Sequence, residues 1–269
     1  MEQSTSSENE PWFVNSLARG ISVLLAFSEN REALRTTDVA EICGMSRAAA
    51  RRFLMTLTAL GYLRSTGNRF SLTAKMLDFG HAYLTSIGAV DLVQPLLEEL
   101  TAACGETSSL AVLDDLDVVY LARTPTRRRI TLRVGIGSRI PAYASSLGKA
   151  ILAYLDQGEI DRILASLDFR QLTDQTITDV DRFKEVLETV RRNGYAVTVS
   201  ELEYGVASIA VPILGYRGKV VAAVNVSTHT SGDDTDRLPR AFLPPLTKAK
   251  REIEAALKAL PNFAAGLEY

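Results

Sequence analysis

The stretch from Thr36 to Leu60 constrains the fold most, because it reads as two short helices joined by a tight turn. Thr36 or Thr37 can cap the first helix, Gly44 ends it, and Ser46 can cap the second. Plotted at about 100° per residue, the second helix has an apolar side made of Ala49, Ala50, Phe53, Leu57 and Leu60. Its opposite side carries Arg47, Arg51, Arg52, Met55 and Thr58, with the small Ala48 among them. A cationic helix face of low relief is what docking in a DNA major groove requires.

Charge and turn signals after the second helix support the same interpretation. Between Ile42 and Leu77 the basic residues are Arg47, Arg51, Arg52, Arg64, Arg69 and Lys75, and there is no Asp or Glu, although the whole chain has a formal net charge of -2. Two short strands, 62–64 and 69–72, flank a glycine-containing turn at 65–68. This hairpin predicts a wing beside a helix-turn-helix, and the local positive charge predicts a phosphate footprint.

Composition limits the other classes of protein. With 269 residues, 46% of them hydrophobic, the chain can form two domains with cores. It has no apolar run long enough to span a membrane, and its N-terminus is polar and acidic, so we expect a cytoplasmic protein. Cys43 and Cys104 are isolated, and His81 and His229 are the only histidines. We therefore expect no metal site, no disulfide and no cofactor.

The order of signals predicts five segments. Residues 1–12 are expected to be disordered, 13–73 to form a winged helix-turn-helix domain, 74–90 a linker helix, 91–262 an effector-binding domain, and 263–269 a tail. A helix at 15–28 should complete the N-terminal core with Leu17, Ile21, Leu24, Leu25 and Phe27. Thr73 can cap the linker helix, which should run to about Ile87.

The second domain is predicted to mix strands with helices. Strands are expected at 108–113, 118–123, 130–134, 195–199, 207–214 and 220–227, with a hairpin turn at 216–218. Helices are expected at 91–103, from Ser145 or Ser146 to about Leu155, at 159–166, at 180–193 and at 243–260. The pattern indicates an α+β domain with one curved antiparallel sheet, helices on one side and a pocket on the other.

No catalytic arrangement emerges from the motifs. The segment 135–150 fails as a phosphate-binding loop, because Tyr143 stands where the first glycine belongs and Ala150 where Ser or Thr belongs. Neither histidine belongs to a recognisable triad. What remains is a helix N-terminus at 145–148, which favours a small anion such as a carboxylate. An ordinary capped helix is the alternative.

Several segments together resemble the IclR family of bacterial transcriptional regulators. In the N-terminal half they are SLARGISVLLAFSE and TTDVAEICGMSRAAARRFLMTLTALGYL; in the second half they are PAYASSLGKAILA, GYAVTVSELEYGVASIAVPI and AAVNVSTHTS. The resemblance covers 13–260. Within the family, SRAAARRFL, RTPTRRRITLRVGIGSRIPAY and NVSTH are most similar to the PcaR, PcaU and PobR branch, which controls aromatic acid catabolism through the β-ketoadipate pathway. Lys149 stands where that branch would have arginine, which leaves the effector open.

The resemblance implies a GAF-like effector domain and a homodimer or dimer of dimers on a double-stranded, pseudopalindromic operator. Its pocket would be lined by Ser146, Leu147, Val206, Ser208, Asn225 and Ser227 and would hold a small organic acid, an aromatic acid or a ring-cleavage product. On a strand, Asn225 and Ser227 face the same side and can offer donors to a carboxylate. The basic run 127–129 and Arg133 could also attract an anion, or form a solvated turn.

The DNA-binding residues expected from the helix-turn-helix and wing are Thr37, Ser46, Arg47, Ala48, Arg51, Arg52, Arg69 and Lys75. Arg47 and Arg51 are expected to read bases, and Arg52 and Lys75 to meet phosphates. RNA polymerase is a further candidate partner. The alternatives are an IclR-type regulator of another carboxylic acid pathway, an enzyme acting on a small carboxylic acid, and an interaction module without DNA contact. The lack of a nucleophile, base and metal set argues against the enzyme.

Overall fold

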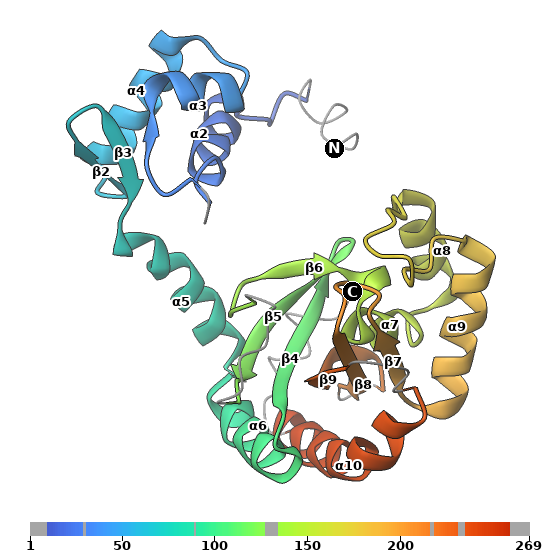
Figure 1. Ribbon diagram of the computed structural model, residues 1–269. Coiled ribbons are helices and arrows are strands. Elements are labelled where there is room, and N and C mark those ends of the chain that lie inside the picture. The colour runs from blue at the N-terminus through green and yellow to red at the C-terminus, as the bar shows by residue number, and fades with distance from the viewer. Residues whose placement is uncertain are drawn as a thin grey trace. The chain divides into compact units, whose positions relative to one another are not determined.

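The computed structural model describes residues 10–28, 31–88, 90–126, 134–215, 218–230 and 235–258. The chain divides into two compact units, Met1–Ala82 and Tyr83–Tyr269 (Figure 1). The junction falls within one helix, α5, which spans Leu77–Ile87. Each unit has its own hydrophobic core and is described here by itself.

The N-terminal unit is a three-helix core with a small antiparallel sheet. Its elements are α2 (Asn15–Leu25), β1 (Leu34–Arg35), α3 (Thr36–Ile42), α4 (Arg47–Ala59), β2 (Leu63–Thr66) and β3 (Arg69–Leu72), followed by a 3-10 turn (Ala74–Met76) that leads into α5. The sheet order is β1-β3-β2. Gly67 closes the β2–β3 hairpin at a φ of 62°, a left-handed conformation that glycine adopts without strain. The predicted helix-turn-helix and wing are confirmed.

The buried faces of two helices differ from those expected. In α4 the core side chains are Ala50, Leu54 and Leu57, whereas Leu60 lies beyond the helix end and is exposed. The predicted face was wrong because it left out Leu54, the residue at its centre. In α2 the buried residue is Val23, followed by Ala26 and Phe27 after the helix. The predicted apolar face was also wrong in part, since Leu17, Ile21 and Leu25 are 63%, 48% and 76% exposed.

The caps of the helix-turn-helix are confirmed for the second helix only. The Ser46 hydroxyl accepts a hydrogen bond from the Ala49 N–H at 3.2 Å, as expected of an N-cap. Neither Thr36 nor Thr37 caps α3, because both lie inside it. The Asp38 carboxylate instead accepts the Arg35 N–H at 2.8 Å, which closes the start of the helix from its third position.

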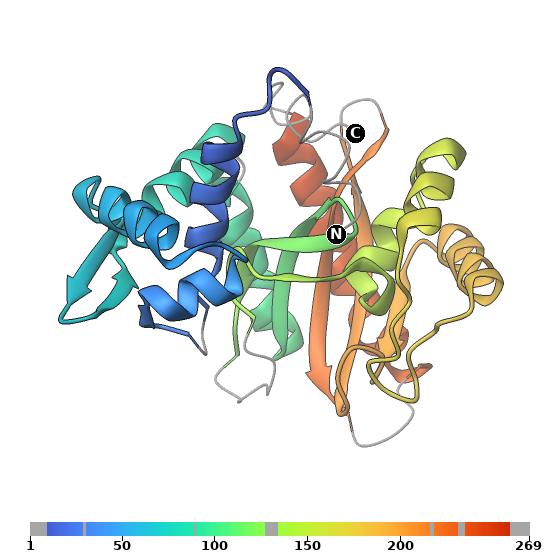
Figure 2. The same ribbon diagram turned by 90° about the horizontal axis from the view of Figure 1, so that it is seen from above.

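The C-terminal unit is built on one six-stranded antiparallel sheet. Its helices are α6 (Val90–Cys104), α7 (Ser146–Leu152), α8 (Gln157–Ser166), α9 (Val180–Asn193) and α10 (Arg237–Lys258). Its strands are β4 (Thr107–Asp114), β5 (Asp117–Thr124), β6 (Arg139–Pro141), β7 (Ala196–Val199), β8 (Val206–Leu214) and β9 (Val220–His229), in the order β6-β5-β4-β9-β8-β7. The sheet is curved, and α7 lies in its concave side (Figures 1 and 2).

Helices cover both faces of this sheet. On one face α6 and α10 pack with side chains such as Leu97, Leu246 and Ile253, and on the other α7 and α9 pack with Leu147, Ile151 and Phe183. The α+β class with a curved antiparallel sheet is confirmed. The expectation of helices on one side and only a pocket on the other was wrong, because the apolar concave face needs α7 and α9 to cover it.

Local chemistry explains most helix ends and one misplaced start. Gly194 ends α9 in the left-handed conformation, at a φ of 81°, and Thr73 caps the 3-10 turn before α5, both as predicted. α10 begins at Arg237 rather than 243, because its first turns are anchored by the buried Leu238 and Phe242. Strand β6 was predicted as loop.

Some expectations fall on residues outside the described ranges. They are the disorder of residues 1–9, most of the strand at 130–134, the basic run 127–129 with Arg133, most of the turn at 216–218, and the tail from 263. In the helices that are described, we find none that is long and apolar enough to cross a membrane.

Candidate DNA-binding and effector sites

The outer face of α4 presents the cationic surface expected of a recognition helix. Arg47, Ala48, Arg51 and Arg52 are exposed in its first two turns, and Ser46 begins the helix. Among the residues that the structure describes, none of these three arginines has an ion-pair partner. The guanidinium groups are therefore available to phosphates and to base edges.

Three other residues expected at the DNA interface make contacts within the protein. The Lys75 Nζ donates to the Leu60 carbonyl at 2.9 Å and lies 4.9 Å from the centre of the Tyr62 ring. A cation at this place complements the negative C-terminal end of α4. Arg69 donates through Nη1 to the Ala33 carbonyl at 2.9 Å, and the exposed Thr37 hydroxyl donates to Asp38 at 3.2 Å. DNA contacts by these residues remain predictions.

In the C-terminal unit, all six residues expected to line the effector pocket border one cavity. They come from three places: Ser146 and Leu147 from the start of α7, Val206 and Ser208 from β8, and Asn225 and Ser227 from β9. The register puts Ser208 directly opposite Ser227, and both project toward α7 with Asn225, two residues away.

Hydrogen bonds between these polar side chains leave one group without a partner. The Ser146 and Ser208 hydroxyl oxygens are 2.7 Å apart, and the Asn225 Nδ2 donates to the Ser208 Oγ at 2.9 Å and to the Ser227 Oγ at 3.0 Å. Both amide hydrogens are thus used within the protein. The Asn225 Oδ1 is buried and accepts no hydrogen bond from the described residues. Asn225 was expected to donate to a carboxylate, but its unused group is an acceptor.

Arg123 is the positively charged residue of this cavity. It lies on β5, is half-buried, and has no hydrogen bond or ion pair among the described residues. Its guanidinium carbon lies 5.9 Å from the centre of the Tyr120 ring. Burial lowers the pKa of Arg123, yet a guanidinium stays charged at neutral pH. A half-buried cation without an acid partner is a binding group for an anion.

Sequence reasoning missed Arg123, together with Tyr120, Thr198 and Leu202 of the same lining. A signal for Arg123 was present: it is the single charge within the apolar run VVYLA and the following RT of one strand. A charge in a strand that is otherwise buried on both faces needs a partner or a ligand. Attention instead went to the neighbouring run 127–129, which lies outside the described residues.

The cavity is small in this state. Its volume is about 40 Å³, whereas a cavity that holds a benzene ring has about 150 Å³. Leu202, which lines it, belongs to the short segment between β7 and β8, flanked by Ser200 and Gly205 with φ values of 55° and 78°. A ring-sized ligand therefore requires the walls to move outward.

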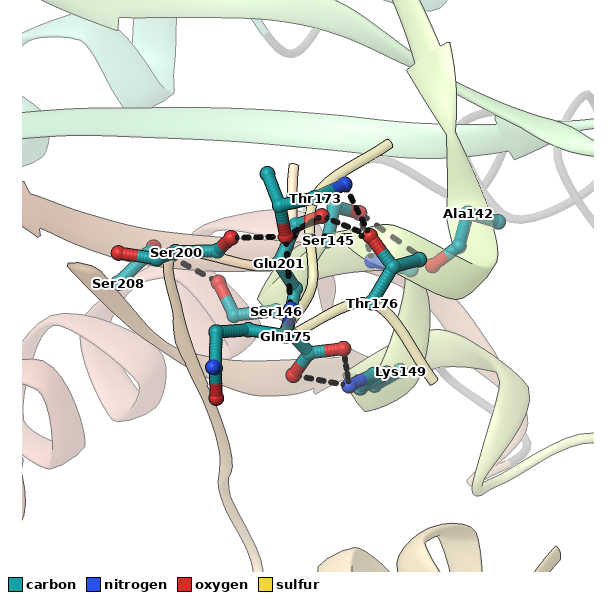
Figure 3. A network of polar contacts seen from close by, with 11 residues as sticks. Ala142, Ser145, Ser146, Lys149, Thr173, Gln175, Thr176, Ser200, Glu201 and Ser208 are labelled. Atoms are coloured by element: carbon teal, nitrogen blue, oxygen red, sulfur yellow. Dashed lines mark hydrogen bonds and ion pairs between the residues drawn. The ribbon is translucent and has the colours of Figure 1, made fainter. Parts of the chain in front are cut away.

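A buried ion pair ties that segment to α7. The Lys149 Nζ lies 2.5 Å from each carboxylate oxygen of Glu201 (Figure 3). The Thr176 hydroxyl donates to the Glu201 carbonyl at 2.7 Å, and Thr173 donates to the Ser200 carbonyl at 2.6 Å. Burial lowers the pKa of Lys149 and raises the pKa of Glu201, while each charge opposes the shift of the other. The ion pair thus holds one wall of the cavity on the helix that forms another.

The fold and these sites define a class: a winged helix-turn-helix protein that carries an α+β domain with a polar, cationic cavity. Two family models match the chain, the IclR helix-turn-helix domain over residues 16–67 and the bacterial transcriptional regulator IclR C-terminal domain over residues 81–255. The chain belongs to the IclR family of transcriptional regulators.

Relatives agree along nearly the whole chain. The Pca regulon regulatory protein of Pseudomonas putida is 38% identical over 245 residues, which cover 91% of this chain and 84% of that protein. The p-hydroxybenzoate hydroxylase transcriptional activator of Acinetobacter baylyi is 37% identical, with 90% and 91% covered. The crystal structure of RHA06195 from Rhodococcus sp. RHA1 has a TM-score of 0.82 at 40% identity and covers 92% of this chain and 100% of that one. The predicted branch is confirmed, and so is the prediction that the chain is a regulator and not an enzyme.

Proposed function

We propose that this regulator controls genes for aromatic acid catabolism by the β-ketoadipate pathway, in response to a small organic acid bound in the C-terminal unit. Two relatives take their names from the Pca regulon and from p-hydroxybenzoate hydroxylase. Regulation by another carboxylic acid is the second candidate, favoured by the same cationic cavity and by Lys149 in place of the expected arginine.

Arg123 is the observation that carries the proposal. An acid effector brings a negative charge into a half-buried site, which is unfavourable unless a cation meets it there. Arg123 offers a planar pair of N–H donors that matches a carboxylate, and it has no competing acid in the described lining. Tyr120, Ile140 and Leu147 supply apolar surface for a ring or an alkyl chain.

At the DNA, two recognition helices would enter successive major grooves of a pseudopalindromic operator. This requires a homodimer or a dimer of dimers, and the exposed Leu17, Ile21 and Leu25 of α2 are apolar side chains that a second copy could cover. The effector would favour one of two arrangements of the DNA-binding units through α5. RNA polymerase is a further partner for either sign of regulation.

The test is binding of candidate acids to the purified full chain, followed by calorimetry and thermal unfolding. The panel contains protocatechuate, 4-hydroxybenzoate, catechol, β-ketoadipate, muconate and short-chain keto acids. A ligand at 100 times its Kd stabilises the native state by about 2.7 kcal/mol. We expect a pathway acid to bind, and Arg123→Met to weaken it at least tenfold.

Arg191→Met is the matched control, because Arg191 is exposed on α9 and does not line the cavity. Equal binding by wild type and Arg123→Met would remove Arg123 from the site. Binding by keto acids alone would favour the second candidate pathway, and no binding across the panel would overturn the aromatic-pathway proposal.

A further inference from the structure

Asn225 places an unused hydrogen-bond acceptor inside the effector cavity. The residue is 2% exposed, and it lines the cavity from the middle of β9. Its Nδ2 hydrogens go to Ser208 and Ser227, so its Oδ1 is left without a donor among the described residues. Buried polar atoms without a partner are rare, and one in a ligand cavity marks a group that the ligand completes.

The sheet register places this acceptor in line with Arg123. Ser109 on β4 is paired with Arg123 on one side and with Asn225 on the other. Residues paired across an antiparallel sheet project from the same face. Two strand spacings separate Arg123 from Asn225, which is about 10 Å between backbones. A ligand that lies along this row meets a cation at one end and an acceptor at the other.

We propose that the effector is a monocarboxylate carrying a hydroxyl group, with the carboxylate on Arg123 and the hydroxyl donating to the Asn225 Oδ1. This inference rests on the proposed function and narrows its substrate class. A dicarboxylate such as a ring-cleavage product would bring a second anionic acceptor against Oδ1, which is repulsive. A plain benzoate would bury Oδ1 without a donor, and a site built to hydrogen-bond a hydroxyl rejects the analogue that lacks it.

The experiment compares acids that differ at one position, by calorimetry on the full-length protein. Hydroxyl-bearing probes are 3-hydroxybenzoate, 4-hydroxybenzoate and protocatechuate. Probes without a donor are benzoate, 4-fluorobenzoate, 4-methoxybenzoate, β-ketoadipate and muconate. We expect the best hydroxy acid to bind at least about tenfold more tightly than its fluoro or unsubstituted counterpart.

Variants locate the preference. Asn225→Ala should reduce the ratio of the Kd values of 4-fluorobenzoate and the best hydroxybenzoate to about one, while benzoate binding is retained. Ser227→Ala is the matched control: it removes a partner of Nδ2, leaves the acceptor, and should keep the preference. If Asn225→Ala does not fold, as judged by circular dichroism, Asn225→Asp serves instead, because it keeps acceptors at this position and should still favour hydroxy acids over 4-fluorobenzoate.

Three results would overturn the inference. Equal affinities of the fluoro and hydroxy acids would leave a carboxylate site without a hydroxyl requirement, and the proposed function would stand. Tighter binding of 4-methoxybenzoate or of a dicarboxylate would show that the amide is turned, with Nδ2 facing the ligand. A preference for hydroxy acids that survives in Asn225→Ala would place the hydroxyl elsewhere. Failure of every acid to bind would instead overturn the proposed function itself.

Discussion

Lys149 and Glu201 form an ion pair inside the C-terminal unit, with side chains 1% and 9% exposed and the Nζ 2.5 Å from both carboxylate oxygens. Lys149 lies on α7, and Glu201 on the segment that carries Leu202 into the cavity wall. Threonine hydroxyls hold the backbone of that segment (Figure 3). The contact joins two walls of the effector cavity, so its loss should affect both stability and ligand binding.

Breaking this pair on one side leaves a buried charge without its partner. We expect Lys149→Met or Glu201→Gln to lower the free energy of unfolding of the C-terminal unit by about 3–5 kcal/mol. The double variant Lys149→Met/Glu201→Leu should be less destabilised than the sum, because neither charge remains. Urea unfolding followed by circular dichroism measures all three. Single variants that lose less than about 1 kcal/mol would show that the pair behaves as a solvated one.

The penalty of Glu201→Gln should depend on pH. Burial raises the pKa of Glu201 above its ordinary value of 4.5. The carboxyl therefore favours folding in its protonated form; this contribution is fully present below about pH 4.5 and is lost as pH rises through the folded-state pKa. In the variant, Lys149 can lose its proton more easily, since burial lowers its pKa. We expect the stability difference between wild type and variant to shrink from about pH 5 to pH 8; a difference that grows would contradict this.

Gly148 is required by the close approach of α7 to the turn before it. A Cβ at this position would lie 2.1 Å from the Ala142 carbonyl oxygen and 2.4 Å from its Cα. We expect Gly148→Ala to destabilise the unit by about 1–3 kcal/mol or more, since backbone must move. Gly158→Ala in α8 is the control, because no atom lies within 4 Å of its Cβ. Thermal unfolding compares them, and equal midpoints would refute the clash.

Lys75 is expected to support the recognition helix more than it binds DNA. It donates to the last turn of α4 and lies on the Tyr62 ring. Lys75→Met should lower the stability of the N-terminal unit by about 0.5–1 kcal/mol and leave the salt dependence of DNA binding nearly unchanged. A salt slope reduced by about one, with unchanged stability, would make Lys75 a phosphate contact.

Arg51 and Arg52 should differ in what they recognise. With an operator obtained by selection from random duplexes, Arg51→Ala should weaken binding by about 1–3 kcal/mol and relax specificity at one base pair. Arg52→Ala should weaken all operator variants alike and lower the salt slope. Fluorescence anisotropy provides both readouts, and Arg191→Ala on α9 is the charge-matched control. Uniform weakening by Arg51→Ala would assign that residue to phosphate.

Local signals were sufficient for much of the fold. Ser46, Gly67, Thr73 and Gly194 mark helix starts, a hairpin and a helix end in the places predicted, because capping and left-handed turns depend on a few neighbouring residues. The six effector residues also border one cavity, as the family resemblance implied.

What the sequence could not supply depends on contacts distant along the chain. Arg123 becomes a pocket residue only through the pairing of β5 with β4 and β9. The unused acceptor of Asn225 follows from two serines that claim its amide hydrogens. Likewise the partner of Lys149 is 52 residues away. Periodicity alone also misjudged α2, whose exposed Leu17 and Leu25 look like core residues in sequence.

The central claim, that an acid in the Arg123 cavity controls DNA binding, is tested most directly by the operator affinity of the full-length protein with and without its best-binding acid. A coupling of about 1–3 kcal/mol predicts a change of roughly 5–150-fold in the Kd for DNA, in either direction. The change should be absent in Arg123→Met and present in Arg191→Met. Equal operator affinity with and without saturating acid in the wild-type protein would contradict the account.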